Sequence, residues 1–323
     1  MRTPAGFLYL MSSKNTTFAK PPLCVEEQLK LLSYRGLVIQ DKILAQHYLK
    51  FISYYRFCGY GIEFEDEARN GEKYYHSGTT FEQILDYYVF DRKLRLLVID
   101  AIERIEIAIR TIITNELSLK YGAHWYLDRG LFLKGFKHAE FVEQIKKDTG
   151  YTAAGGSIQH KKRERFIQHY FDKYSVPELP PVWMVAEVLS LGTWSMVFAN
   201  LIDRDNQKII CNHFGISYSV MTSWLHTLTY LRNLCAHHSK LWNRNFTLKP
   251  LVANNYRAYL ENNTCFAAQA AILNIFLRIV SPENQWSQHL FDLMEKHPLI
   301  NITKMGFKEG WINDQFWQSS CQP

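Results

Sequence analysis

The spacing of apolar residues predicts helices along most of the chain. From Phe81 to Tyr121 the sequence contains no proline or glycine, and its apolar residues recur at intervals of three and four. This pattern predicts one long helix or two nearly collinear helices, with Thr79 or Thr80 as the N-cap. At 1.5 Å per residue the segment would span about 60 Å, so we expect it to be the spine of the fold.

A second helix with a strong apolar side is predicted over residues 217–242. Shorter helical patterns occupy residues 24–34, 41–50, 137–147, 162–173, 183–201, 205–213, 253–280 and 286–296. Alternating strand-like patterns are scarce, and residues 63–80 indicate an exposed loop or a short hairpin. The sequence therefore predicts an all-α protein with one domain over residues 1–323, in which 1–21 are disordered and 251–323 form a C-terminal helical extension.

Composition indicates a globular protein in a reducing compartment. Hydrophobic residues make up 47% of the chain and aromatic residues 15%, which is enough for a buried core. The net charge of +6 suits an anionic partner without requiring one. The six cysteines are widely spread and form no Cys-x-x-Cys pair, and no apolar run is long enough for a signal peptide or a membrane span. We expect a soluble protein of the cytosol.

The candidate chemistry lies in the run of residues 231–238, which contains Arg232, Asn233 and His237. A guanidinium clamps phosphate oxygens, and a histidine moves protons near neutral pH. Asn233 and His237 are four residues apart and share a helix face, whereas Arg232 must reach round the helix unless it loosens near Cys235. Asn233 could orient the imidazole or bind phosphate itself. These groups suffice for RNA cleavage through the 2′-hydroxyl, with no metal or other cofactor.

Three other interpretations of this run remain open on spacing alone. Arginine and histidine five residues apart are common on solvated helix faces. Cys235, His237 and His238 could ligate zinc, although no second ligand pair lies at a suitable spacing elsewhere. His238 could also be a spare catalytic group, but its distance of four residues from Leu234 and from Trp242 favours a packed histidine.

One histidine cannot act as acid and base at once. A two-fold axis through the helix over residues 217–242 would bring two Arg/His pairs into one cleft and supply both groups. We therefore expect a homodimer with this helix at the contact.

Asp91/Arg95, Asp100/Arg104 and Glu106/Arg110 have the i,i+4 spacing of ion pairs on the long helix. Dense charges also lie on segments that are otherwise apolar enough to be buried, and these are Arg56, Arg92, Glu103, Arg104, Glu106 and Arg110. Paired core charges are the favoured interpretation. The alternative is that Arg104 or Arg110 lies behind the cleft and orients Arg232, His237 or the phosphate.

A basic segment follows the glycine-rich residues 151–156 and suits an RNA backbone. Its cationic side chains are Lys161, Lys162, Arg163 and Arg165. A solvated helix face would have the same composition, so this RNA-binding assignment depends on independent evidence for an RNA partner.

The string RNLCAHHSKLWNR, residues 232–244, resembles the signature of the abortive-infection Abi family, the AbiD-like and AbiF-like phage-defence proteins of the HEPN ribonuclease superfamily. Similar segments follow the family's order over about residues 22–317. They lie at residues 27–29, 35–37, 52–57, 87–92, 101–106, 180–183, 187–192 and 305–307, with Arg110 and Trp311 in addition.

The resemblance implies a HEPN-like helical bundle and a metal-independent endoribonuclease. It implies an active site at Arg232, Asn233 and His237, and a dimer formed across this motif. It also implies a link to a noncoding RNA, because AbiF-like relatives are associated with one. Two other functions stay open: an RNA-binding protein that holds a structured noncoding RNA without cleaving it, and a helical scaffold for protein partners.

Overall fold

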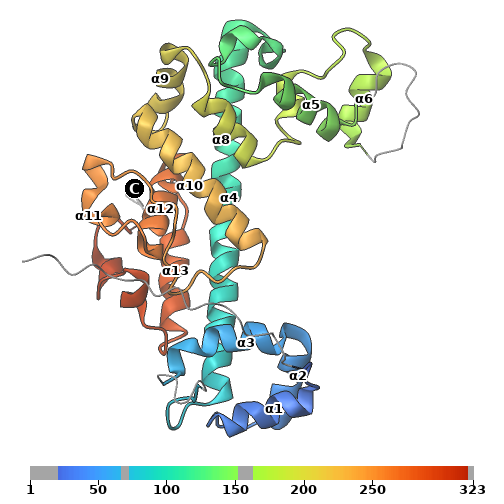
Figure 1. Ribbon diagram of the computed structural model, residues 1–323. Helices are drawn as coiled ribbons and strands as arrows, with labels where there is room; N and C mark the ends of the chain where they lie inside the picture. Colours follow the sequence, from blue (N-terminus) through green and yellow to red (C-terminus); the bar gives the residue numbers. More distant parts are fainter. Residues whose placement is uncertain (1–20, 67–72, 152–162, 319–323) are drawn as a thin grey trace, which may run out of the picture. The chain divides into compact units, whose positions relative to one another are not determined.

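The computed structural model describes residues 21–66, 73–151 and 163–318, and within these ranges the fold is all-α. Thirteen α-helices and six short 3-10 helices account for the regular structure of these residues, and β-pairing among them is confined to isolated bridges (Figure 1). The predicted fold class is confirmed. No helix in the described part is long and apolar enough to cross a membrane.

The chain divides into two compact units, Met1–Leu85 and Asp86–Pro323. The single domain expected over residues 1–323 therefore stays a prediction. Residues 1–20, most of the segment expected to be disordered, lie outside the described residues.

The described part of the first unit contains three helices and a short paired segment, and it ends with the first residues of the helix that begins at Phe81. The helices are α1, Val25–Tyr34, α2, Lys42–Ile52, and α3, Tyr54–Gly61, followed by the 3-10 turn η1, Ile62–Phe64. The helix α3 was not predicted, because tyrosines and glycines interrupt its apolar pattern. Glu65 and Tyr75 form an antiparallel bridge, and Arg35 binds the Glu65 carboxylate at 2.6 Å. Residues 64–66 and 74–76 are thus paired, as the hairpin alternative expects, and residues 67–72 lie outside the described residues.

The predicted long helix is one continuous helix, α4, Phe81–Tyr121. Its start is held by a reciprocal cap, in which the Gln83 amide donates to Thr80 Oγ1 at 3.2 Å and the Thr80 amide donates to Gln83 Oε1 at 2.9 Å. Its apolar side supplies fully buried core residues, among them Ile105 and Ile109.

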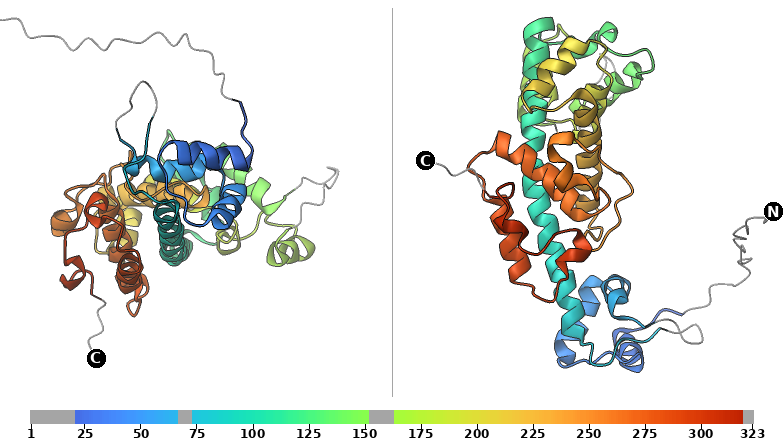
Figure 2. Two further views of the ribbon diagram at one scale, coloured as in Figure 1. Left: turned by 90° about the horizontal axis from the view of Figure 1, so that it is seen from below. Right: turned by 90° about the vertical axis from the view of Figure 1, so that its left-hand side faces the viewer.

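The second unit is built around α4, and Figure 2 shows its other helices along that helix. The helices that follow α4 are α5, His138–Thr149, α6, Arg165–Lys173, α7, Val182–Val185, α8, Leu191–Ala199, α9, Arg204–Asn212, α10, Tyr218–Ala236, α11, Arg257–Leu260, α12, Phe266–Val280, and α13, Trp286–Glu295. Short 3-10 turns η2 to η6 are Trp125–Leu127, Arg129–Leu131, Asn254–Tyr256, Ile302–Met305 and Trp311–Asn313. The helix α10 packs against α8 and α12.

Two predicted helices are each divided in the structure. Residues 183–201 form α7 and α8, and Ser190 caps the second of these by accepting a hydrogen bond from the Thr193 amide. Residues 253–280 form α11 and α12, and residues 266–277 of α12 are buried on every side. The first break lies in an apolar stretch, where periodicity alone does not reveal it, whereas the second coincides with the polar residues 261–264.

Candidate functional site

The candidate motif lies at the C-terminal end of α10. Leu228, Leu231 and Leu234 are buried on the side of α10 that faces the core. Asn233 is exposed on the opposite side, and Arg232 is half-buried between the two. The Asn233 side-chain oxygen lies 3.5 Å from Arg232 Nη1, so this amide contacts the guanidinium.

The helix ends at Ala236, six residues before the predicted end at Trp242. The His238 amide donates to the Cys235 carbonyl at 3.0 Å, and the Ser239 amide donates to the Leu234 carbonyl at 2.8 Å. These two bonds form a Schellman motif, whose left-handed position is occupied by His238 with φ of 55°. Glycine or asparagine usually marks this position, so the sequence did not signal the end.

This ending decides how both histidines lie. His237 is the C-cap of α10 and is exposed, and His238 is exposed as well. The packed role that spacing favoured for His238 is therefore wrong. A non-glycine residue in the left-handed region is strained, and such strain is concentrated at functional sites.

The segment that follows the motif is anchored by Asp91 of α4. This carboxylate is fully buried and its Oδ1 accepts hydrogen bonds from the Leu241 amide at 2.9 Å and the Trp242 amide at 2.7 Å. Arg95 pairs with the same carboxylate and donates to the Ser239 carbonyl at 3.4 Å. The predicted Asp91/Arg95 pair is thus present, and it fixes the chain directly after His237 and His238.

A second carboxylate of α4, that of Glu106, lies close to the motif arginine. Burial raises the pKa of Glu106, although the nearby guanidinium groups of Arg232 and Arg110 and a hydrogen bond to the Leu191 backbone act in the opposite direction. Glu106 therefore contributes negative charge beside Arg232 in a partly dehydrated environment, where such an interaction is stronger than in water.

The two arginines proposed as supporting groups differ in position. Arg110 binds Glu187 at 2.6 Å and lies in the surroundings of Glu106, which it shares with Arg232. Arg104 pairs with Asp100 on the surface of α4. The structure therefore brings Arg110 towards the motif, whereas Arg104 binds a carboxylate of its own helix.

Part of the predicted RNA-binding segment has a structural role. Lys161 and Lys162 lie outside the described residues, and Arg165 is exposed at the start of α6. Arg163 donates from Nε to the Gly150 carbonyl at 3.1 Å, and its guanidinium lies 4.8 Å from the centre of the Phe171 ring.

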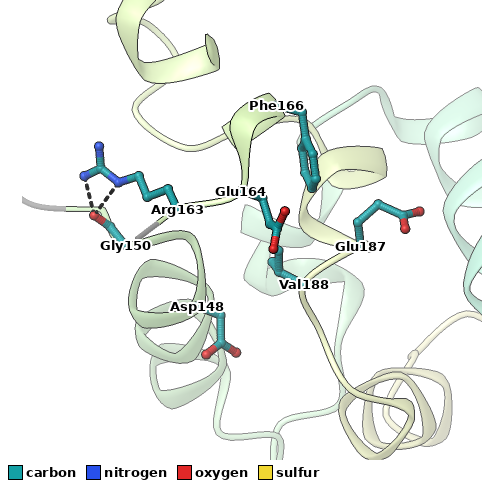
Figure 3. Close-up of a pocket in the computed structure, with 7 residues that line it drawn as sticks. All are labelled: Asp148, Gly150, Arg163, Glu164, Phe166, Glu187 and Val188. Carbon is teal, nitrogen blue, oxygen red and sulfur yellow. Dashed lines mark hydrogen bonds between the residues drawn. The ribbon is translucent and has the colours of Figure 1, made fainter. Parts of the chain in front are cut away.

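A pocket of about 470 Å³ lies beside this arginine (Figure 3). It is lined by the carboxylates of Asp148, Glu164 and Glu187, and the Arg163 guanidinium is turned to Gly150. Three carboxylates disfavour a polyanion. The pocket is therefore a poor site for an RNA backbone.

Cys235 does not support the alternative in which the motif binds zinc. Cys235 is buried, and burial raises the pKa of its thiol to about 12. Zinc binds the thiolate, and a cysteine buried in the core does not present its sulfur to an ion from solvent. Within residues 21–66, 73–151 and 163–318, no group of three His, Cys, Asp or Glu side chains could hold a metal ion.

Sequence reasoning missed the roles of Asp91 and Glu106. Both were recognised as charges on an apolar helix, and Arg95 and Glu106 are eleven residues apart, which places them on one side of α4. Their contacts with residues 239–242 and with Arg232 join parts of the chain more than a hundred residues apart, which no local spacing reveals.

Comparison with known proteins identifies the family of the chain. A family model described as Abi-like protein matches residues 47–243, which include α4, α10 and the whole run of Arg232, Asn233 and His237. The comparisons with curated proteins and with solved structures each gave no match. The match extends over more than half of the sequence, and the chain therefore belongs to the Abi-like protein family.

Proposed function

We propose that this protein is a metal-independent endoribonuclease of the HEPN type that acts in abortive infection. The family supports the coarser part, since its description is Abi-like protein. The nuclease assignment rests on the end of α10, where His237 is exposed at the C-cap while Arg232 is half-buried beside Asn233 and Glu106. A phosphate at this end would meet a positioned guanidinium and a solvent-accessible imidazole.

The proposed reaction is the attack of a 2′-hydroxyl oxygen on the adjacent phosphorus. A bond forms between O2′ and phosphorus, and the bond between phosphorus and O5′ breaks, which leaves a 2′,3′-cyclic phosphate and a 5′-hydroxyl. Arg232 stabilises the charge that builds on the phosphate oxygens. His237 either accepts the proton of the 2′-hydroxyl or donates one to O5′. Asn233, through its contact with Arg232, restricts the guanidinium to the side of α10 that faces solvent.

A second proton carrier completes this scheme. We propose that it is His237 of a second copy of the chain, in a homodimer whose contact includes α10. The exposed position of His237 and Asn233 leaves this end of the helix accessible to a partner. His238 of the same chain is exposed next to His237 and is the alternative proton carrier.

The second candidate function is binding of a structured noncoding RNA without cleavage. The observation that favours it is that each chain supplies one His237, so a monomer in which His238 does not act would hold phosphate at Arg232 and lack one of the two proton transfers. Both functions require RNA at the same end of α10. Regulation of the nuclease by a bound noncoding RNA would combine them.

Incubation of the protein with labelled RNA in excess EDTA separates the functions. Fragments that end in a 2′,3′-cyclic phosphate support the nuclease. Tight binding without fragments supports the RNA-holding protein. If the protein neither binds nor cleaves RNA, the scaffold for protein partners is the function that stays open.

A further inference from the structure

The net charge of the chain is concentrated around α10. Residues 206–282 contain seven lysine and arginine residues and one carboxylate, Glu261, which gives +6. The whole chain has 37 basic and 31 acidic residues, so the remainder holds 30 of each and is neutral. The seven cationic residues are Lys208, Arg232, Lys240, Arg244, Lys249, Arg257 and Arg278. The segment that carries the motif therefore has a net charge equal to that of the whole chain.

The chain after the motif returns alongside α10. The Tyr230 hydroxyl is hydrogen-bonded by Arg244 and by Thr247, the latter at 3.3 Å. Further towards the start of α10, the Leu251 amide donates to Ser223 Oγ at 2.8 Å.

The next contacts continue in the same direction. Trp224 Nε1 donates to the Leu251 carbonyl at 2.9 Å, and the Tyr256 ring lies 6.1 Å from the ring of Trp224. Residues 240–256 thus run antiparallel to α10 from its C-terminal end to its first turns.

This course places cationic side chains along the helix as well as at its end. Lys249 and Arg257 are exposed, and Lys240 is half-buried with its ammonium 5.4 Å from the centre of the Trp242 ring. On α10 itself, His226, Asn233 and His237 are exposed. From Ser223 to His237 the helix is about 21 Å long at 1.5 Å per residue, which is enough for several nucleotides.

Two carboxylates of α4 near the motif contribute little opposing charge at the surface, whereas Glu103 of the same helix is exposed. Asp91 is fully buried and is paired with Arg95, and Glu106 is half-buried between Arg232 and Arg110. A polyanion along α10 would therefore meet cations with little opposing charge from these two groups, and long-range attraction would guide it to the motif.

We propose that residues 240–257 and the exposed side of α10 form the track along which single-stranded RNA reaches Arg232 and His237. This proposal rests on the proposed function, since it takes RNA as the partner. It locates the backbone contacts at Lys240, Lys249 and Arg257 and not at the segment with Lys161, Lys162 and Arg165. Binding is electrostatic and does not depend on base sequence.

The test measures how binding of a single-stranded 2′-O-methyl RNA oligonucleotide of mixed sequence depends on salt. This probe lacks the attacking hydroxyl, so its affinity is independent of cleavage. The slope of log K against log salt flattens by about 0.7 for each phosphate of a single strand that the protein no longer neutralises. We expect Lys240→Gln, Lys249→Gln and Arg257→Gln together to flatten the slope by up to three such steps and to weaken binding at low salt.

A matched control removes the same number of charges elsewhere, by Lys161→Gln, Lys162→Gln and Arg165→Gln. We expect the control to keep the wild-type slope. A charge-conserving variant, Lys240→Arg with Lys249→Arg, should also keep it, which separates charge from folding.

Three results would each contradict the proposed RNA track: an unchanged slope in the first triple variant, equal flattening in both triple variants, or no binding of the probe by the wild type. Cleavage of unmodified RNA by the first variant at saturating RNA would then show that the nuclease assignment survives the loss of the track. Conversely, the expected slopes without any cleavage by the wild type would support the track and contradict the nuclease.

Discussion

Removal of the Asp91 carboxylate is expected to be one of the most damaging single changes in the second unit. Asp91 is fully buried, accepts two backbone hydrogen bonds from residues 241 and 242, and neutralises the buried Arg95. In Asp91→Ala both amides lose their acceptor and the guanidinium loses its carboxylate partner. Breaking a buried ion pair from one side costs about 3–5 kcal/mol. Leaving the two backbone amides without an acceptor costs about 1–3 kcal/mol each, which gives a similar range. The two costs overlap, so they are not added together.

The same helix contains a matched control. Asp100 pairs with Arg104 at the same i,i+4 spacing, but both side chains are partly exposed. Such a pair contributes about 0–1 kcal/mol. We therefore expect Asp100→Ala to change the free energy of unfolding by less than about 1 kcal/mol. Comparison with Asp91→Ala then separates the effect of burial from that of the i,i+4 spacing.

Urea unfolding at neutral pH, followed by circular dichroism, measures both variants against the wild type. Asp91→Asn keeps one oxygen acceptor and loses the charge, so it should lie between the two, at about 1.5–3 kcal/mol. If Asp91→Ala is too unstable to purify, the order of Asp91→Asn and Asp100→Ala still tests the reasoning. An Asp91→Asn loss no larger than that of Asp100→Ala would refute the anchoring role.

Three further predictions concern the motif and its neighbours. In initial-rate assays, Arg232→Lys should cleave RNA as poorly as Arg232→Ala, because an ammonium lacks the planar fork that holds two phosphate oxygens. An Arg232→Lys rate of half the wild-type rate would contradict this prediction. Burial raises the pKa of Glu106 above 4.5, so the folded state favours the protonated carboxyl. The stability that this preference contributes is fully present at low pH and declines as the pH rises through the folded-state pKa. We therefore follow the free energy of unfolding in urea, as Glu106→Gln minus wild type. This difference should rise between about pH 4 and pH 7. A constant or falling difference would argue against the burial effect. A mixture of Arg232→Ala and His237→Ala chains should recover part of the cleavage that neither has alone, since mixed dimers hold one intact arginine and one intact histidine in one cleft and lack only the second histidine; proven heterodimers no more active than the single variants would argue against the shared cleft.

The helical skeleton could be predicted because its strongest signals are local. α4 follows from 41 residues with apolar spacing and no proline or glycine, and Thr80 caps it as expected. The end of α10 could not be predicted in the same way. Its terminating residue is His238 in the left-handed region, and leucine and tryptophan at residues 241 and 242 continue the apolar spacing although the backbone has already left the helix. Apolar spacing reports burial, and burial continues past the helix end.

The site divides along a similar line. Arg232, Asn233 and His237 are adjacent in sequence and could be selected from residue chemistry and from resemblance to a family. Asp91 and Glu106 lie near the motif because the fold brings α4 close to residues more than a hundred positions later in the chain. Of the basic residues expected to bind RNA, Arg163 is bound to the Gly150 carbonyl, which local charge does not reveal. The charge imbalance of residues 206–282 arises from missing carboxylates, and a search for basic runs does not detect it.

The most direct test of the central claim is cleavage of a labelled RNA in excess EDTA by the wild type and by His237→Ala, with analysis of the new ends. Proton transfer by one positioned side chain contributes about 10² to 10⁴ in rate. The proposal therefore predicts wild-type fragments ending in 2′,3′-cyclic phosphate, and a His237→Ala rate at least about a hundredfold lower with unchanged circular dichroism. Cleavage by His237→Ala at more than about a tenth of the wild-type rate, or wild-type activity that disappears in EDTA, would contradict it.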